Sequence, residues 1–308
     1  MKYRRLGKTG LDVSVVGLGT WQFGGEWGKH FTQPEVDRLL GRAQELGVNL
    51  MDTAECYGDH RSEALIGQAI HQQRGRWIVA TKFGHRFHNN FERTDHWSPQ
   101  EVLGQLEASL KALRTDYLDI YQFHSGGDTA FDQDELWEML GAQVKAGKVR
   151  HLGISISSKS ENLHQVQRAN QVGVSVVQVL YNRLDRGPEQ RVLPACHQQD
   201  LGVLVRVPLA SGLLSGKYTP GVEFSHPEDI RSLQAKAEIQ ERLKLVQHIQ
   251  QKEVPAGVRM AAWALAWCLA HPAVTCVIPG CKTIEQLEAN ASAADFQIVR
   301  ADHTQALV

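Results

Sequence analysis

Four side chains with complementary chemistry end or closely follow three short apolar runs of the sequence. Asp52 follows VNLM, Lys82 follows WIVAT and His124 ends YLDIYQFH, while Tyr57 lies five residues after Asp52. Each run has the length and the flanking turn residues of a buried strand. If these strands are parallel neighbours, their carboxyl ends bring an acid, a phenol, an amine and an imidazole to one edge. Such a set of groups is suited to donating a proton to a carbonyl oxygen.

Tyr57 is the expected proton donor. An isolated phenol titrates near pH ~10, and a neighbouring ammonium group favours the phenolate, so Lys82 should lower the pKa of Tyr57. Asp52 should keep Lys82 charged and oriented, and His124 could hold the carbonyl by a hydrogen bond. No side chain can supply a hydride, so reduction of the carbonyl would need a nicotinamide cofactor.

Each of these residues alone also fits a structural role, as a helix cap, an ion-pair lysine or a packed histidine. Their joint placement at one predicted edge is what favours catalysis. The histidines of the next loop, His85, His88 and His96, are assigned no role.

Composition sets the class of protein. The 308 residues are 42% hydrophobic with a net charge of -1, which gives no electrostatic reason to expect binding to nucleic acid or to an anionic membrane. No charged-then-apolar leader opens the sequence, and the apolar stretch from Met260 to Ala270 is too short to span a bilayer. Five cysteines without a CxxC pair suggest a reduced, cytoplasmic protein.

The pattern of elements predicts one domain over residues 1–308, a (β/α)8 barrel. An opening hairpin should turn at residues 8–10. Strands are then predicted over 48–53, 77–83, 118–124, 149–155, 174–182, 202–210 and 274–280, with a weak eighth over 295–299. The alternating helices are predicted over 34–46, 62–71, 99–113 with Ser98 as N-cap, 133–146, 160–171 and 189–199.

Two further features bear on the fold. A doubly wound sheet is the alternative, but its GxGxxG signature is incomplete, because Gln22 stands where the third glycine should follow Gly17 and Gly19. A long insertion over residues 215–257, after the sixth predicted strand, should carry a helix from residue 227 or 230 to Lys252. Long loops of this kind are commonly functional, so this one is expected to fold over a ligand.

The sequence resembles the aldo-keto reductase family from residue 3 to about residue 300. The segments MDTAECYG, TKFG, QFH, GIS, VQVLYN, VPLASGLLSGKY and IPGCKTIEQLEAN carry the resemblance. It implies that Asp52, Tyr57, Lys82 and His124 form the catalytic tetrad. It also implies that NADPH, with NADH as a weaker alternative, binds in extended form across the barrel mouth without a Rossmann fold. The pro-R hydride would pass to an aldehyde or ketone.

The same resemblance assigns cofactor contacts. Ser155 and Gln178 correspond to residues at the nicotinamide carboxamide, and Gly19 and Thr20 to residues near the ribose and pyrophosphate. Lys282 would offer a point charge to a 2′-phosphate. The remaining assigned positions are Asp52, Arg206, Val207, Pro208, Leu209, Ser211, Leu213, Ser215, Lys217, Gly280, Thr283, Gln286 and Asn290.

Several positions depart from the family pattern. Ile156 stands where many relatives have asparagine, and Gln286 and Ala289 replace a common arginine and glutamate. Arg206 stands where an aromatic residue often stacks on the nicotinamide, a role that a guanidinium plane can also fill.

The sequence indicates the substrate-binding residues less clearly than the cofactor-binding residues. Trp21 and Trp27 could wall an apolar or sugar-binding pocket together with Phe87, Tyr57 and His124. The substrate itself and the oligomeric state stay open. Cys56 is expected to be a buried, neutral thiol.

Other functions remain as alternatives. An aldolase-like Schiff base at Lys82 is disfavoured by the neighbouring Asp52, and a redox-sensing regulatory module by the complete tetrad. No HExxH motif or HxH after the first strand is present, so no metal is expected.

Overall fold

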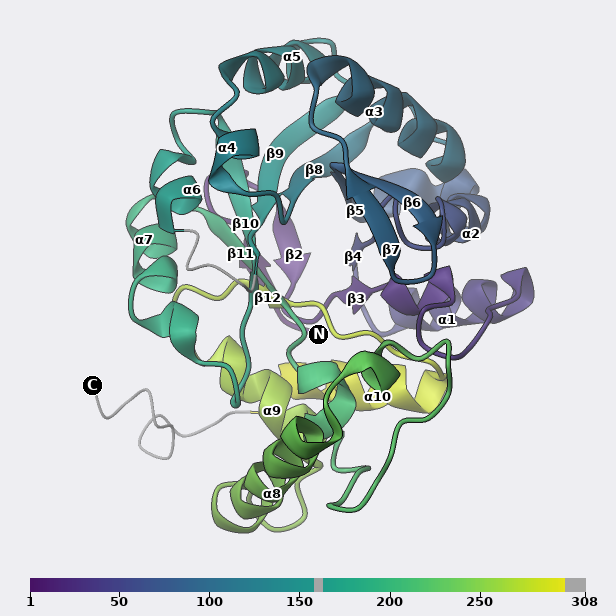
Figure 1. The fold of residues 1–308 in the computed structure, drawn as a ribbon, viewed down its shortest axis with the longest axis vertical. Coiled ribbons are helices and arrows are strands. Elements are labelled where there is room, and N and C mark those ends of the chain that lie inside the picture. Colours follow the sequence, from purple (N-terminus) through teal and green to yellow (C-terminus); the bar gives the residue numbers. More distant parts are fainter. Residues whose placement is uncertain (158–162, 297–308) are drawn as a thin grey trace.

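The computed structural model describes residues 1–157 and 163–296. Eight parallel strands form its centre, and each pairs with the next along the chain (Figure 1). In chain order they are β3 (Leu18–Gly19), β4 (Leu50–Asp52), β5 (Ile78–Phe83), β8 (Leu118–His124), β9 (Val149–Ser155), β10 (Val174–Leu180), β11 (Gly202–Arg206) and β12 (Cys276–Val277).

The first and last of these strands meet, so the sheet closes on itself. Parallel bridges join Val16 to Val277 and Gly19 to Gly280. The Gly17 N–H donates to the Val277 carbonyl at 2.8 Å. The (β/α)8 barrel predicted from the pattern of elements is therefore confirmed.

One strand of the barrel was predicted in the wrong place. Of the expected strand at 295–299, Asp295 and Phe296 are not in a strand, and residues 297–299 lie outside the described part of the chain. The strand that the prediction missed is β3, the first strand of the barrel in chain order. It lies within the segment that the sequence assigned to the opening hairpin. β3 has only two residues and one is glycine, which leaves no apolar run for a pattern to detect. The long insertion consequently follows the seventh barrel strand.

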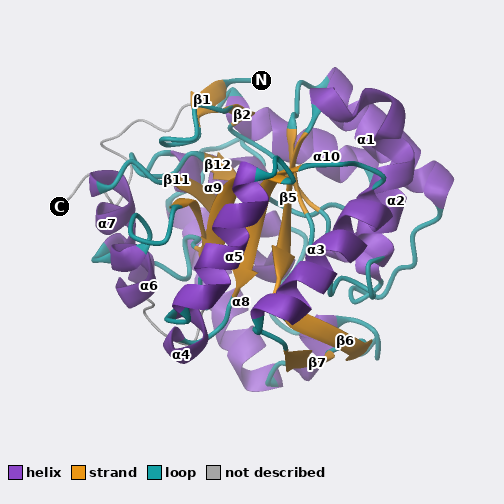
Figure 2. Cartoon of the chain, turned by 90° about the horizontal axis from the view of Figure 1, so that it is seen from above, coloured by secondary structure: helices purple, strands orange, loops and turns teal. Residues whose placement is uncertain are grey.

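The opening hairpin closes the amino-terminal end of the barrel. β1 (Tyr3–Arg5) and β2 (Asp12–Ser14) pair antiparallel, as expected. Leu6 and Val13 are fully buried, and they pack against inward-facing residues of several barrel strands, among them Leu50, Ile120 and Leu204. A second hairpin, β6 (His85–Asn89) with β7 (Glu92–Asp95), was not predicted. Figure 2 shows it at the opposite end of the barrel from β1 and β2.

Helices surround the strands, and the predicted helices outside the insertion have bounds that agree with the observed ones to within a few residues. α3 illustrates why: Ser98 caps it, Pro99 opens it, and Glu101 completes a capping box. The α-helices are α1 (Gln33–Glu45), α2 (Arg61–Ile70), α3 (Pro99–Leu113), α4 (Asp128–Phe131), α5 (Asp134–Lys145), α6 (Leu163–Arg168), α7 (Val192–Gln198), α8 (Lys236–Lys252), α9 (Met260–Leu269) and α10 (Ile284–Ala291). Short 3-10 turns are η1 (Trp21–Gly24), η2 (His71–Arg76), η3 (Gly187–Glu189), η4 (Ala210–Ser215), η5 (Ile230–Leu233) and η6 (Ser292–Ala294).

The insertion after β11 lies at the carboxyl end of the barrel. Its α-helix begins at Lys236, later than expected, because Asp229 caps the separate turn η5 through the Arg231 N–H. The segment before α8 meets the loop after β3, where the Gly28 N–H donates to the Glu228 carbonyl at 3.0 Å. The insertion thus spans part of the barrel mouth, while α8 projects outward at the lower edge of Figure 1.

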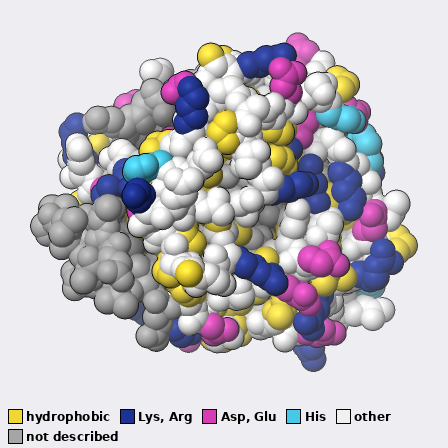
Figure 3. Space-filling model, turned by 90° about the horizontal axis from the view of Figure 1, so that it is seen from below, with side chains coloured by type: hydrophobic (Ala, Val, Ile, Leu, Met, Phe, Trp, Pro, Cys, Tyr) yellow, Lys and Arg dark blue, Asp and Glu magenta, His cyan; other side chains and the backbone are white. Residues whose placement is uncertain are grey.

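The outer surface carries both signs of charge. On the face shown in Figure 3, acidic and basic side chains are interspersed. Within the two described ranges, no helix combines the length and the apolar character needed to cross a membrane.

Closure of the barrel predicts that a side chain at position 19 destabilises the protein. A Cβ at this position would lie 2.6 Å from the carbonyl oxygen of Ile278, the residue that follows β12, the strand that completes the barrel. Gly19→Ala should therefore cost about 1–3 kcal/mol of unfolding free energy, as overpacking typically does. Gly41→Ala is the matched control, because a Cβ there meets nothing within 4 Å inside α1 and should add about 0.5–1 kcal/mol. Urea unfolding measures the unfolding free energies of the two variants. Equal values for the two would contradict this view of closure.

Candidate active site

The structure brings the four candidate residues together at the carboxyl ends of neighbouring strands. Lys82 of β5 donates from Nζ to Asp52 Oδ1 at 2.6 Å, to the Thr53 carbonyl at 2.7 Å and to the Tyr57 hydroxyl at 3.0 Å. His124 ends β8, and its ring lies edge-on to the Tyr57 ring with centroids 6.2 Å apart. The arrangement predicted from the three apolar runs is the one observed.

Asp52 anchors the group through both carboxylate oxygens. Oδ1 accepts from Lys82, and Oδ2 accepts from Gln178 Nε2 at 2.6 Å and from Gln122 Nε2 at 3.0 Å. Gln178 also accepts from the Ser155 hydroxyl at 3.3 Å. These bonds tie together side chains from β4, β5, β8, β9 and β10, so the acid and the amine are held in fixed positions.

Burial and neighbouring charges together set the protonation of Lys82 and Tyr57. Desolvation alone would lower the pKa of Lys82, but Asp52 and Tyr57 outweigh it, so the pKa lies above its ordinary value. For Tyr57, burial raises the pKa to about 12, and the nearby Lys82 only partly offsets that rise. The expected net lowering of the Tyr57 pKa is therefore wrong for the protein alone, because a phenolate here would lose its hydration.

His124 is a neutral imidazole in this setting. Burial lowers its pKa well below the ordinary value, and the nearby His85 and Lys82 lower it further. The ring centroid of His85 is 4.8 Å from that of His124. The sequence assigned no role to His85, and a histidine in a polar loop gives no signal that it will fold back onto the site.

A layer of buried carboxylates lies behind the site. Glu55 accepts from the His85 N–H at 3.1 Å, but its Oε2 has no hydrogen-bond partner among the described residues. Burial, followed by repulsion from Glu63, raises the pKa of Glu55 to about 7. Cys56 is fully buried, and burial raises the pKa of its thiol well above the ordinary value, so the thiol is neutral as expected.

One group here has metal-ligand chemistry. Glu55, Cys56 and His124 each offer one ligand atom, and these atoms lie within 4.8 Å of one another. Cys56 Sγ and His124 Nδ1 are 3.7 Å apart, the distance of a sulfur hydrogen bond. The expectation that the protein uses no metal stays a prediction.

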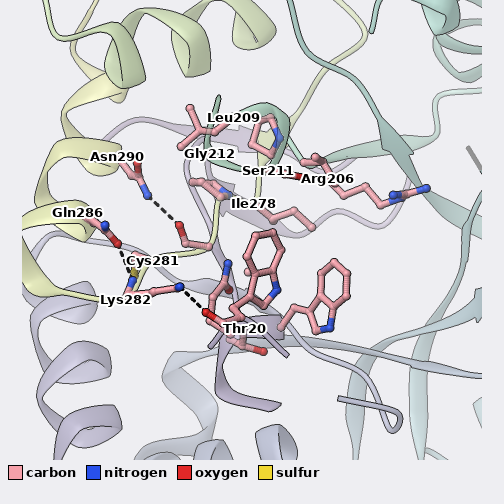
Figure 4. Close-up of a pocket in the computed structure, with 18 of the residues that line it drawn as sticks. Thr20, Arg206, Leu209, Ser211, Gly212, Ile278, Cys281, Lys282, Gln286 and Asn290 are labelled. Carbon is pink, nitrogen blue, oxygen red and sulfur yellow. Dashed lines mark hydrogen bonds between the residues drawn. The ribbon is translucent and has the colours of Figure 1, made fainter. Parts of the chain in front are cut away.

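A cavity of about 520 Å³ opens from the candidate residues across the barrel mouth (Figure 4). Lys82 is fully buried behind its wall. The residues assigned from the sequence that line the cavity are Gly19, Thr20, Trp21, Trp27, Asp52, Tyr57, His124, Gln178, Arg206, Val207, Pro208, Leu209, Ser211, Ser215, Lys217, Gly280, Lys282, Gln286 and Asn290.

Besides Lys82, four assigned residues do not line this cavity. Leu213 is buried in the hydrophobic core, and Thr283 caps α10 by accepting from the Gln286 N–H. Ser155 lies behind Gln178, to which it donates. Phe87 lies in β6, and its cross-strand partner Arg93 lines the cavity instead.

Arg93 is one of several lining residues that the sequence did not reveal. It pairs with Glu26, a fully buried carboxylate that also accepts from the Trp21 indole N–H. Neither residue belongs to an apolar run or a motif, so only the folded loops bring them together. The other unassigned lining residues with large or polar side chains include Gln22, Tyr218, Arg231 and Glu285.

The loop after β11 has the backbone of an anion cradle. Val207, Ala210 and Ser211 have positive φ angles of 54°, 47° and 56°, and Gly212 follows at 91°. Such conformations are strained for residues other than glycine and recur at binding sites, where successive N–H groups form an anion-binding concavity. The Ala210 and Gly212 N–H groups donate within the loop, to the Val207 and Leu209 carbonyls, so the remaining N–H groups of the loop are those that could meet the phosphates of a nucleotide.

Two lysines add positive charge at the same end of the cavity. Lys282 donates from Nζ to the Trp27 carbonyl, and Lys217 lies over the Tyr218 ring. Neither lysine has an ion-pair partner in residues 1–157 or 163–296. Burial and the neighbouring cations Arg231, Lys217 and Lys29 lower the pKa of Lys282, whereas Asp229 raises it. A bound anion would relieve that repulsion.

Comparison with known proteins agrees with this geometry. A profile described as the Aldo/keto reductase family matches residues 15–306. The uncharacterized oxidoreductase YqkF of Bacillus subtilis is 32% identical over 309 residues, covering 100% of this chain and 95% of the relative. The aldo-keto reductase YhdN of the same organism is 31% identical over 297 residues, covering 94% of this chain and 87% of its own.

Solved structures give the same result. The aldo-keto reductase AKR11C1 from Bacillus halodurans, in its holo form, superposes with a TM-score of 0.83 at 29% identity, covering 100% of this chain and 95% of that one. The glycerol dehydrogenase AKR11B4 from Gluconobacter oxydans gives a TM-score of 0.81 at 25% identity, covering 96% of this chain and 91% of its own.

The raised pKa of Glu55 predicts how stability depends on pH. The folded state prefers protonated Glu55, so the stability this residue contributes is present below its ordinary pKa of 4.5 and lost as the pH rises through about 7. Glu55→Gln should therefore gain up to about 3 kcal/mol relative to wild type between pH 4.5 and pH 8. Unfolding free energies measured at both pH values test this. Glu138→Gln, at an exposed site on α5, is the control and should show a nearly constant difference. A constant difference for Glu55→Gln as well would contradict the prediction.

Proposed function

The chain belongs to the aldo/keto reductase family, and from that premise we propose that it uses NADPH to reduce an aldehyde or ketone, with Tyr57 as the general acid. Membership makes it an NAD(P)H-dependent oxidoreductase of carbonyl compounds. The observation that supports the assignment of Tyr57 is its hydroxyl, 3.0 Å from a lysine that is itself 2.6 Å from Asp52, at the wall of a deep cavity.

The hydrogen bonds around Lys82 leave the Tyr57 proton available. An ammonium group has three donors and no acceptor. Lys82 directs those donors to Asp52, to the Thr53 carbonyl and to the Tyr57 oxygen. The hydroxyl proton of Tyr57 therefore need not point at Lys82 and is free to face a substrate oxygen in the cavity.

The raised pKa of Tyr57 suits this role. With a pKa of about 12 in the protein alone, the phenol keeps its proton throughout the physiological range. When the proton moves to the substrate oxygen, the phenolate left behind lies against Lys82, whose charge Asp52 maintains. Lys82 thus stabilises the charge that develops during the reaction, and such interactions raise the rate.

His124 orients the substrate in this proposal. Its lowered pKa leaves it neutral, so one ring nitrogen carries a proton that can be donated to the carbonyl oxygen. Trp21 and Trp27, with ring centroids 5.2 Å apart, form an apolar wall beside Tyr57, whose ring centroid is 5.9 Å from that of Trp21. Phe87, which is absent from the lining, is left out of the proposed substrate site.

The cavity residues fit a nicotinamide cofactor, which when bound supplies a hydride to the carbonyl carbon. Gln178 and Arg206 lie at the end near Tyr57, and the cradle from Val207 to Gly212 can hold the phosphates. Lys282 and Lys217 at the far end can hold a 2′-phosphate, which is why we propose NADPH over NADH. As part of the same proposal, the chain acts as one cytoplasmic domain on a small carbonyl compound.

Removal of the Tyr57 hydroxyl tests the general acid. Tyr57→Phe should lower kcat for carbonyl reduction by roughly 10²–10⁴, the usual contribution of a general acid, while NADPH binding stays near wild type. Tyr121→Phe is the matched control, because Tyr121 is fully buried and its hydroxyl has no hydrogen-bond partner among the described residues. NADPH oxidation measured over a panel of aldehydes and ketones gives the rates. Wild-type turnover by Tyr57→Phe would assign the donor elsewhere.

Removal of the Lys282 charge tests the cofactor preference. Lys282→Ala should raise the Kd of NADPH by about tenfold or more and leave that of NADH almost unchanged, because only NADPH carries the 2′-phosphate. Lys244→Ala, at an exposed lysine of α8, should change neither value. Equal losses for both cofactors would place the 2′-phosphate away from Lys282.

A further inference from the structure

Arg206 ends β11 beside the candidate acid, and it is a cation without a carboxylate partner among the described residues. Its Nη2 donates to the Ile156 carbonyl at 3.1 Å, and its Nε is buried without a hydrogen-bond partner. It lines the same cavity as Tyr57 and Asp52, whose charges act on its pKa. No carboxylate in the described ranges lies within ion-pair distance of it.

The other cations near Tyr57 are neutralised. Lys82 is 2.6 Å from Asp52, and Arg93 pairs with the buried Glu26. Arg93 lines the cavity and Lys82 lies behind its wall, and each contacts its counter-charge. Arg206 therefore contributes most of the unbalanced positive charge at this end. Although burial lowers its pKa, a guanidinium keeps its proton at any physiological pH.

We propose that the charge of Arg206 makes the site bind the reduced, neutral nicotinamide ring more tightly than the oxidised, cationic ring, and so adapts the enzyme to carbonyl reduction. This inference rests on the proposed function. A hydride donor must lie within bonding reach of the carbonyl carbon whose oxygen Tyr57 protonates. The ring therefore lies at the end of the cavity that Arg206 occupies.

The rest of the cofactor does not contribute to this preference. Its phosphates and adenosine are identical in the oxidised and reduced forms, so their contacts cancel in the ratio of the two dissociation constants. Figure 4 shows Lys282 and Arg206 on opposite sides of the pocket, which separates the residue that binds both forms from the residue that distinguishes them.

The sign of the effect depends on the kind of residue at position 206. The face of an aromatic ring attracts a cation and would favour the oxidised nicotinamide. A guanidinium repels the same cation, and like charges a few ångströms apart in a partly buried site interact strongly. With partial compensation from Asp52, we expect the ratio of Kd for NADP+ to Kd for NADPH to fall by about tenfold when the charge is removed. For a two-electron couple, tenfold corresponds to about 30 mV in the potential of the bound cofactor.

The test measures binding rather than activity. The full chain is titrated with NADPH and with NADP+, and quenching of tryptophan fluorescence reports binding, because Trp21 and Trp27 line the cavity. Arg206→Gln should lower the Kd ratio about tenfold, mainly through tighter NADP+ binding. Arg206→Lys keeps the charge and should keep the wild-type ratio. Lys282→Ala is the control, since it should weaken both forms equally and leave the ratio unchanged.

The outcomes separate this inference from the proposed function. If wild type and variants bind both forms but Arg206→Gln keeps the wild-type ratio, this inference is overturned and the proposed function stands. If Arg206→Lys shifts the ratio as far as Arg206→Gln, shape and not charge is responsible, which also overturns it. If wild type binds neither form, the proposed function fails and the inference with it. Thermal unfolding of each variant confirms that the comparison is made on folded protein.

Discussion

The contact between Lys82, Asp52 and Tyr57 is the interaction on which the site depends. A fully buried ammonium needs a carboxylate and a full set of acceptors, since removing a charge from water is otherwise very costly. Asp52 and the Thr53 carbonyl meet most of that need, and the Tyr57 oxygen takes the third donor. The bonding needs of the lysine thus fix the position of the phenol.

The network beyond this contact explains why it is rigid. Asp52 is held on both carboxylate oxygens, because Lys82, Gln122 and Gln178 all donate to it. His124, Ser155 and Gln178 are register partners across β8, β9 and β10. Strand pairing therefore sets their relative heights, and the side-chain bonds set their rotamers. A site held in this way needs little reorganisation when charge develops in it.

The two ends of the cavity differ in how their charged side chains are paired. Near Tyr57, Lys82 and Arg93 form ion pairs, whereas Arg206 forms none within residues 1–157 and 163–296. At the far end, Lys217 and Lys282 lack ion-pair partners among the described residues and lie next to a strained, N–H-rich loop. An elongated ligand with an anionic end and a reactive neutral end satisfies both regions.

The sequence by itself determined the barrel class, most element bounds and the four candidate residues, because buried parallel strands leave long apolar runs and their ends are marked by polar residues. It could not locate β3, which has two residues and gains its stability by pairing with β4 and bridging to β12. Nor could it find Arg93, Glu26 or His85, since loops carry no periodicity and converge only when the chain has folded. Tertiary structure also decided the pKa of Tyr57. The lysine was visible in the sequence, but the degree of burial, which outweighs it, is a property of the packed fold alone.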